Sequence, residues 1–182
     1  MIRFLTAGES HGPELTGIIE GVPAGFTITK DFIDSYLQRR QKDTGSGGRM
    51  NIESDEVFIS SGVVNNISTG APIALRIKNK DWENWKDKEI EPYVVPRPGH
   101  ADLIGTAKYD LNDIRLVLER SSARETAMRS AIGAIAIQIL ESMGISIYGY
   151  VSSIGKVEYR YSNDFSLDEM KKLTDESPVS CP

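Results

Sequence analysis

The alternation of apolar and polar residues predicts four short strands in the first eighty residues. Ile2 to Thr6 and Leu15 to Glu20 are apolar runs on either side of a loop that contains a histidine. Two further runs of this kind cover Glu56 to Ser60 and Pro72 to Lys78, and the turn residues near them favour antiparallel pairing. The first part of the chain is therefore expected to form an antiparallel sheet.

Helical spacing predicts a helix between the second and third of these strands. We expect it to begin at Thr29 or Asp31, because the apolar residues that follow recur at intervals of three and four: Phe32, Ile33, Tyr36 and Leu37. The helix runs directly into a basic, glycine-rich segment, RRQKDTGSGGRM.

The strongest helical signal lies in the middle of the chain. Ser122 to Glu125 has the sequence of a capping box, and Gly144 follows Met143 as a stop signal. Between residues 131 and 140 only Gln138 is polar, so this half of the helix should be buried on several sides. An apolar stripe left uncovered would be an interface, either with a second copy or with a further part of the fold.

Weaker patterns complete the expected elements. The polar segment NKDWENWKDKEIEPY is expected to be an exposed excursion, although it holds two tryptophans. Strands are expected at Ser146 to Val151 and Lys156 to Tyr161. A second capping box, Ser166 to Glu169, predicts a short helix near the end of the sequence.

Composition indicates one globular domain and excludes several classes of protein. The 182 residues suffice for one sizeable core but not for two. The net charge of -5 gives no general reason to expect nucleic acid, so anion binding has to be local. Cys181 is the single cysteine, which excludes an internal disulfide and a cysteine-cluster metal site and fits a reducing cytoplasm. No apolar run approaches the roughly 20 residues of a membrane span.

The two histidines occupy matched positions. His11 and His100 both follow apolar residues, and both lie on loops shaped by glycine and proline. Imidazole titrates near neutral pH, so the pair is suited to proton transfer. The alternative is that each ring only hydrogen-bonds its own turn, and the residues alone support both readings equally. A hydrolase built on Ser10 and His11 is disfavoured, because adjacent side chains rarely converge and no GxSxG motif is present.

Two segments are candidates for anion binding. The loop from Arg39 to Arg49 carries a local charge of +3 and three glycines that allow close approach of a ligand. The segment from Arg120 to Arg124 begins the long helix, where free N–H groups add to its arginines and serines. A solvated basic loop and a simple helix cap are the alternatives. RNA binding is disfavoured because no aromatic residues lie between the basic ones.

Three stretches together resemble the signature segments of chorismate synthases: AGESHGPELTGIIEGVP, RPGHADLIGTAKY and LERSSARETAMRSAIGAIA. The sequence between them is also similar, so the resemblance covers essentially the whole chain. It implies an α+β fold, a β-α-β sandwich with a central helical layer against antiparallel sheet, of which residues 1–182 would be the N-terminal part of the domain and the C-terminal half would be absent. It also implies a homotetramer.

The resemblance implies a lyase of the last shikimate-pathway step. The substrate would be 5-enolpyruvylshikimate 3-phosphate, which loses phosphate and a proton in a 1,4-elimination to give chorismate. Reduced FMN would be the cofactor, with NADP as an associated nucleotide, in a cytoplasmic enzyme with no nucleic acid, membrane or metal partner. His11 is similar to the residue that protonates the departing phosphate, and His100 to the one that protonates reduced flavin.

Further roles follow from the same resemblance. Ser10, Arg40 and Arg49 are similar to substrate contacts. The flavin-binding segment is matched by three residues and a neighbour: Arg120, Ser121, Ser122 and Arg124. The chain departs from the family at Ser46, where arginine is usual, and in lacking the second half that carries the aspartate base. The alternative is therefore a catalytically silent half that folds and self-associates.

Overall fold

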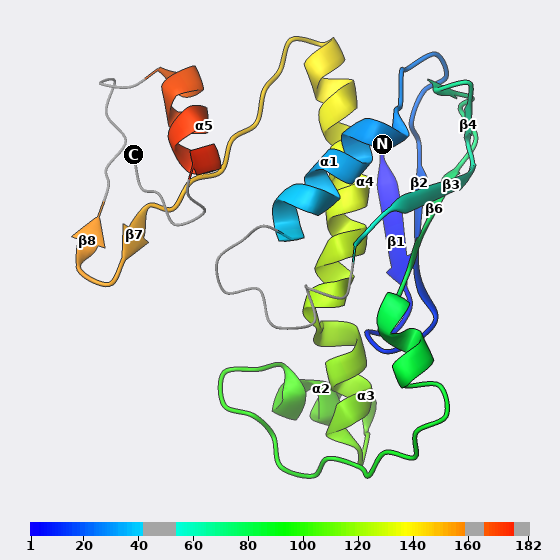
Figure 1. Cartoon of the computed structure of the whole chain (residues 1–182), viewed down its shortest axis with the longest axis vertical. Coiled ribbons are helices and arrows are strands. Elements are labelled where there is room, and N and C mark those ends of the chain that lie inside the picture. Colours follow the sequence, from blue (N-terminus) through cyan, green and yellow to red (C-terminus); the bar gives the residue numbers. More distant parts are fainter. Residues whose placement is uncertain (42–53, 159–165, 177–182) are drawn as a thin grey trace.

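A four-stranded antiparallel sheet forms one layer of the molecule (Figure 1). The computed structural model describes residues 1–41, 54–158 and 166–176. In spatial order the strands are β1 (Arg3–Ala7), β2 (Glu14–Glu20), β6 (Ile73–Lys78) and β3 (Val57–Ser61). All four predicted strands are confirmed, with boundaries shifted by no more than one residue, and so is their antiparallel pairing.

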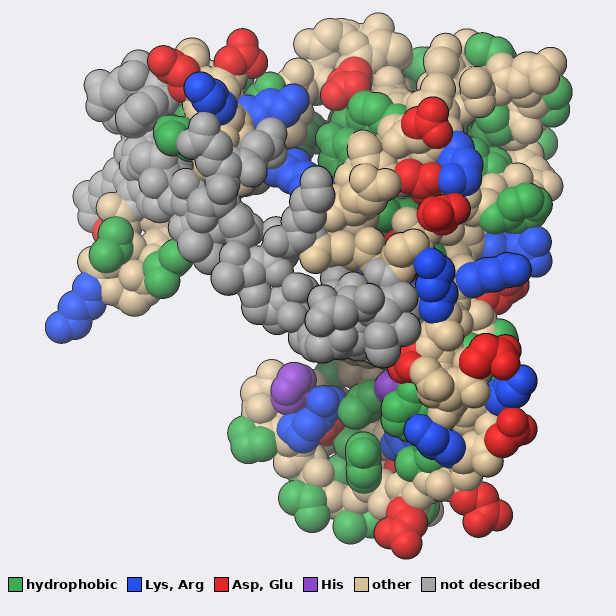
Figure 2. Space-filling view, in the orientation of Figure 1, with side chains coloured by type: hydrophobic (Ala, Val, Ile, Leu, Met, Phe, Trp, Pro, Cys, Tyr) green, Lys and Arg blue, Asp and Glu red, His purple; other side chains and the backbone are tan. Residues whose placement is uncertain are grey.

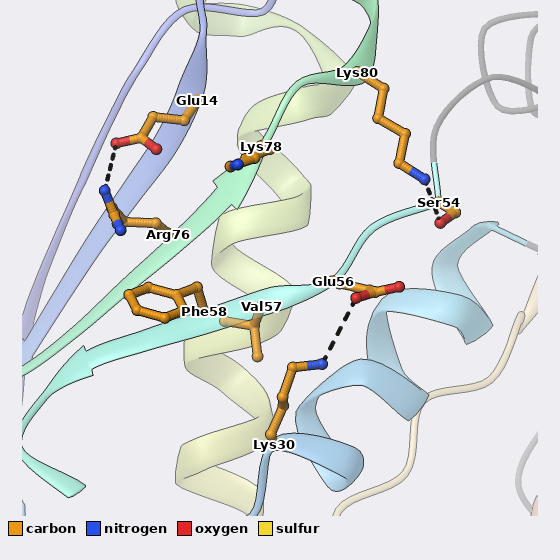
Figure 3. A pocket seen from close by; sticks show the side chains of 9 residues that line it. All are labelled: Glu14, Lys30, Ser54, Glu56, Val57, Phe58, Arg76, Lys78 and Lys80. Atoms are coloured by element: carbon orange, nitrogen blue, oxygen red, sulfur yellow. Dashed lines mark hydrogen bonds and ion pairs between the residues drawn. The ribbon is translucent and has the colours of Figure 1, made fainter.

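The period of two along each strand gives the sheet one buried face. Leu15 and Ile19 on β2, and Leu75 and Ile77 on β6, are almost fully buried. The residues that alternate with these buried positions point to the other face, as Arg76 does (Figure 3). This apolar face has to be covered by another layer of secondary structure.

Helices α1 (Lys30–Gln41) and α4 (Ala123–Ser142) cover that face (Figure 1). Their core residues are fully buried: Ile33 and Leu37 on α1, and Met128 and Ile135 on α4. At 1.5 Å per residue α4 is about 30 Å long, which lets it pass along β1, β2 and β6. The predicted α+β fold, with a helical layer against antiparallel sheet, is confirmed.

The apolar half of α4 is covered more completely than the sequence suggests. No residue from 131 to 140 is exposed, and a stripe of four is half-buried: Gly133, Ala136, Ile137 and Leu140. Gln138, the one polar residue, has a local purpose, because its Oε1 accepts the backbone N–H of Thr29 at 2.8 Å. The polar side chain therefore fixes the start of α1 on α4.

The two predicted capping boxes have different outcomes. Ser166 and Glu169 form a complete box at the start of α5 (Leu167–Glu176), with both reciprocal hydrogen bonds present. Ser122 caps α4 as expected, since its hydroxyl accepts from the N–H of Arg124. Glu125, however, accepts a hydrogen bond from Thr6 at 2.7 Å instead of returning to Ser122. A tertiary partner on β1 has replaced the local one.

Several elements were not predicted. The hairpin of β4 (Val63–Val64) and β5 (Ile67–Ser68) turns at two asparagines with positive φ, a two-residue hairpin signal that the sequence contains. The 3-10 helix η2 (Lys80–Asn84) and the helices α2 (Asp102–Tyr109) and α3 (Ile114–Ser121) follow. For α3 a signal was available, because Asp113 caps the helix through the N–H of Arg115.

The prediction of a strand at Ser146 to Val151 is wrong. This stretch has no regular structure, and Ile147 is 64% exposed, because no described strand edge lies beside it. A small hairpin follows instead, with β7 (Ser153–Ile154) paired to β8 (Val157–Glu158). The expected strand at 156–161 is confirmed only for β8, since residues 159–161 lie outside the described ranges. In the described ranges, no helix has both the length and the apolarity needed to cross a bilayer.

Candidate active site

The loop that carries His11 connects β1 to β2 and is fixed at both ends. Gly8 begins it with a φ of 106°, and a Cβ there would lie 2.5 Å from the carbonyl oxygen of Glu14, so no other residue fits. Asn79, just after β6, donates through Nδ2 to the carbonyls of Glu9 and Gly12 at 3.1 and 2.7 Å. The backbone around His11 is therefore held in one conformation.

The ring of His11 is enclosed by α3 and η2. Its Nδ1 lies 2.7 Å from Oε1 of Glu119, and its backbone N–H donates to Oε2 of the same carboxylate, also at 2.7 Å. The indole of Trp85 lies against the imidazole, with ring centroids 4.1 Å apart. The expectation that this tryptophan segment is an exposed excursion is wrong in this part, because Asp81 is buried and accepts the Trp85 Nε1–H at 2.8 Å.

The start of α4 joins this loop through Ser10. The Ser10 side chain is almost fully buried, and its hydroxyl lies 2.8 Å from that of Ser122. Its backbone N–H donates to the carbonyl of Glu119 at 3.0 Å. Two segments predicted separately, one for substrate and one for cofactor, therefore meet at one point.

The side chains of Arg120 and Ser121, from the predicted flavin segment, differ in their hydrogen-bond partners and in their orientation. Arg120 donates to the backbone carbonyls of Gly8 and Thr6, pairs with Glu125 at 3.2 Å, and has a side chain that is 40% exposed. Ser121 donates to the carbonyl of Val117 at 2.9 Å and so turns back onto α3. Arg120 supports the histidine loop and still reaches solvent, whereas the Ser121 hydroxyl points away from the cluster.

Arg40 and Arg124 meet at a buried aspartate that the sequence reasoning missed. Asp55 accepts from Nη2 of Arg40 at 2.8 Å and from Nη1 of Arg124, and its side chain is fully buried. The Nε of Arg124 donates to Oδ1 of Asn79 at 2.9 Å. Arg124 is thus a buried tie to the histidine loop. Its Nη2 is buried and has no hydrogen-bond partner among the described residues.

His100 lies apart from this cluster of contacts. It is exposed on the loop before α2, where its N–H donates to the carbonyl of Arg97. Arg97 also binds Asp102 through Nε and Nη2 at 2.8 and 2.9 Å, and these hydrogen bonds hold the pKa of Asp102 far below its ordinary value. Both histidine side chains appear on the same face, at the end of the molecule where α2 and α3 lie (Figure 2). Arg49 lies outside the described residues.

A cavity of about 380 Å³ opens beside His11. Trp82 and Trp85 line it, and two cations lie over the Trp85 ring, Lys88 at 4.9 Å and Arg115 at 5.7 Å. Three carboxylates also line the cavity, those of Glu9, Asp113 and Glu119, so its aromatic walls and cations suit a ring-bearing ligand without indicating the sign of its charge. Among the described residues, no group of three or more histidine, cysteine or acidic side chains could hold a metal ion.

A second cavity, of about 420 Å³, lies on the face of the sheet away from α4 (Figure 3). Four cationic and two acidic side chains line it, and ion pairs between them, such as Glu14 with Arg76, offset much of the charge. It contains none of the residues predicted for catalysis or binding. The candidate site therefore remains at the His11 loop and the start of α4.

Comparison with known proteins identifies the family. A family model described as chorismate synthase matches residues 2–182. The chain belongs to the chorismate synthase family. It is 52% identical to a chorismate synthase of Bacillus licheniformis over 99% of this chain and 50% of the relative, and 58% identical to one of Desulfitobacterium hafniense over 86% of this chain and 43% of the relative.

A solved structure supports the same assignment at the level of the fold. A crystal structure of chorismate synthase matches with a TM-score of 0.67 and 43% identity, covering 87% of this chain and 40% of the other. The chain spans about half the length of the curated family members it matches. The resemblance found in the sequence is confirmed, whereas the roles of single residues stay predictions.

Proposed function

We propose that the chain is the N-terminal part of a chorismate synthase domain and acts in the 1,4-elimination of phosphate from 5-enolpyruvylshikimate 3-phosphate. Membership in the family supports the reaction, since enzymes of this name form chorismate. The observation that carries the proposal is the meeting of the His11 loop with the start of α4 through Ser10 and Ser122. A proton donor and a positive helix end are thereby combined in one site.

His11 is the proposed donor of a proton to the departing phosphate. One ring nitrogen is occupied by Glu119, so Nε2 is the atom left to face a ligand. The contact with Trp85 limits rotation of the ring, and general acids must be held in place to act on a reacting group. His100, exposed on its own loop, is the proposed proton carrier to the flavin.

Ser10, Arg40 and Arg49 are the proposed substrate contacts. Arg40 has a side chain only 14% exposed and an acidic partner in Asp55, so it would present an oriented guanidinium rather than a freely rotating one. Ser10 supplies a hydroxyl beside the proposed acid. Arg49 comes from the basic loop, whose charge suits a phosphate and a carboxylate on the same small molecule.

The start of α4 fits an anionic cofactor such as reduced FMN. The buried Nη2 of Arg124 has no hydrogen-bond partner among the described residues, so an anion could accept a hydrogen bond from it close to the positive end of the α4 dipole. Arg120, Ser122 and Arg124 would hold the group, with Ser121 contributing through its backbone position. The chemistry that bound reduced FMN would supply is the loan and recovery of one electron, with no net redox change.

Oligomeric state, cellular location and nucleotide association are also part of the proposal. A homotetramer, a cytoplasmic location and an association with NADP are expected from the family. The half-buried stripe on α4, from Gly133 to Leu140, is consistent with packing against further protein.

The deciding assay is chorismate formation from 5-enolpyruvylshikimate 3-phosphate with chemically reduced FMN under anaerobic conditions. Turnover that depends on His11 is expected wherever the family's remaining half is also supplied. Without that half, the same protein is expected to bind reduced FMN with little or no turnover. Product formation that survives replacement of His11 by alanine would overturn the assignment of the acid.

A further inference from the structure

Glu119 is bound to His11 at more points than an ordinary ion pair requires. It lies in the last turn of α3, is 9% exposed, and uses both carboxylate oxygens on one residue. Oε2 accepts the backbone N–H of His11, and Oε1 lies at Nδ1, each at 2.7 Å. Its own carbonyl accepts the N–H of Ser10. Three contacts therefore connect one residue of α3 to two adjacent residues of the loop.

The groups around the ring leave it little freedom. Trp85, from the segment after η2, lies against the imidazole with the ring planes at 48° to each other. Arg115, one turn earlier on α3, lies 3.7 Å from Oε1 of Glu119 and also over the Trp85 ring, so it restrains both neighbours of His11. Rotation of the imidazole by half a turn would separate Nδ1 from its carboxylate and disturb the contact with Trp85.

We infer that Glu119 is a positioning residue that fixes the neutral His11 ring as the Nδ1–H tautomer and so assigns proton exchange to Nε2. A carboxylate has two acceptors and no proton to donate. The backbone N–H of His11 occupies one oxygen, and the other can make a hydrogen bond to Nδ1 only if Nδ1 is the donor. The part of this inference that concerns turnover rests on the proposed function.

Glutamine at position 119 would reverse this arrangement with almost no change in shape. An amide has one acceptor and one donor end. The backbone N–H of His11 can only donate, so it requires the amide oxygen. The NH₂ group is then turned toward Nδ1, which has to accept, and the ring proton moves to Nε2. Glu119→Gln should therefore invert the tautomer.

Ring-nitrogen NMR on protein labelled with ¹⁵N-histidine tests this directly. The sequence has only two histidines, so a His100→Gln sample assigns both sets of signals. At a pH where the rings are neutral, we expect a protonated Nδ1 on His11 in the wild type and a protonated Nε2 in Glu119→Gln. The opposite tautomer in the wild type, or an unchanged one in the variant, would overturn the inference. The wild-type spectrum decides even if the variant does not fold.

Asp34→Asn is the matched control. Asp34 is also a mostly buried carboxylate that accepts a backbone N–H, that of Val57 at 2.8 Å, but it does so on α1. Its amide variant should leave the His11 tautomer unchanged. A tautomer change in this control would mean that general destabilisation, and not the contact with Glu119, sets the ring.

Turnover separates this inference from the function on which it rests. With reduced FMN and the family's remaining half supplied, Glu119→Gln should lower kcat by about 10²–10⁴ with little change in KM, as loss of a general acid does. Inversion of the tautomer with unchanged kcat would overturn the assignment of His11 as the acid while leaving the positioning contact established. An unchanged tautomer would overturn the positioning contact, whatever the assay gives.

Discussion

The hydroxyl oxygens of Ser10 and Ser122 lie 2.8 Å apart, although 112 residues separate them in the chain. Ser122 is also the N-cap of α4, so the contact connects the His11 loop to the end of a helix where the positive end of the dipole lies. The pair is mostly enclosed by protein. A site assembled in this way depends on the register between β1, β2 and α4, not on either motif alone.

Alanine at each serine should show this coupling. Ser122→Ala removes a helix cap and is expected to lower the free energy of unfolding by about 1 kcal/mol. Ser10→Ala removes the hydroxyl and with it the hydrogen bond to Ser122, at a cost of about 0.5–1.5 kcal/mol. Because the two serines share one hydrogen bond, the double variant should lose less free energy of unfolding than the two single variants lose together. Urea unfolding measures the three losses. Strict additivity would mean that the contact is not formed in solution.

Replacement of His100 should separate function from stability. Its side chain is exposed, so His100→Ala should leave the unfolding midpoint unchanged. If it carries a proton in the reaction, the rate of chorismate formation should fall by about 10²–10⁴. Lys86→Ala, at another exposed position, serves as the control for both measurements. Full activity in His100→Ala would remove this residue from the mechanism.

The Arg97–Asp102 pair predicts a pH dependence of stability. Arg97 lowers the pKa of Asp102 in the folded state, so the folded protein holds this proton less tightly than the unfolded chain. The resulting stabilisation is complete above the ordinary carboxyl pKa, about 3.9, and is progressively lost below it. Urea unfolding between about pH 3 and pH 7 tests this. The free energy of unfolding of the wild type should exceed that of Asp102→Asn by the largest amount at neutral pH. A constant difference across that range would contradict the assignment.

Local signals explain which elements could be predicted from the sequence. Alternation in Leu15, Gly17 and Ile19 is visible without knowledge of any partner, and it placed β2 correctly. The α4 cap was equally local. The strand expected near Ile147 had the right pattern but no described edge to pair with, and a strand depends on that partner.

The site could be predicted only in part, for the same reason. His11 and Ser10 stood out by residue type and turn context. Glu119 and Asp55 did not, because a lone acidic residue in a helix or before a strand looks like surface charge in the sequence. Only the packing of α3 on the loop, and of α4 on the segment before β3, reveals their buried contacts.

The packing of α2 on α3 predicts a steric effect at Gly105. A Cβ at this position would overlap both methyl groups of Val117, whose β-branched side chain cannot rotate away easily. Gly105→Ala should therefore destabilise the protein by about 1–3 kcal/mol in urea unfolding. Gly133→Ala is the control, since a Cβ there meets nothing within 4 Å and alanine favours the helix by up to about 1 kcal/mol. Equal effects of the two substitutions would refute the close contact.

Asp55 pairs with two arginines, Arg40 and Arg124, in the interior. Its side chain is fully buried, and Arg124, its nearer partner, has a side chain only 4% exposed. Asp55→Asn removes the negative charge and leaves the buried guanidinium of Arg124 without an acidic partner among the described residues. Breaking a buried pair in this way typically costs about 3–5 kcal/mol.

The matched comparison for Asp55 is Asp34→Asn, whose partner Lys30 is about half exposed. A smaller loss is expected there, because solvent screens the remaining charge. Replacing both members of the buried pair, as in Asp55→Leu with Arg124→Met, should recover much of the stability, since no buried charge on Arg124 is then left unpaired. Urea unfolding of the three variants at neutral pH measures this order. If Asp55→Asn lowers the free energy of unfolding no more than Asp34→Asn does, then Asp55 does not compensate a buried charge on Arg124.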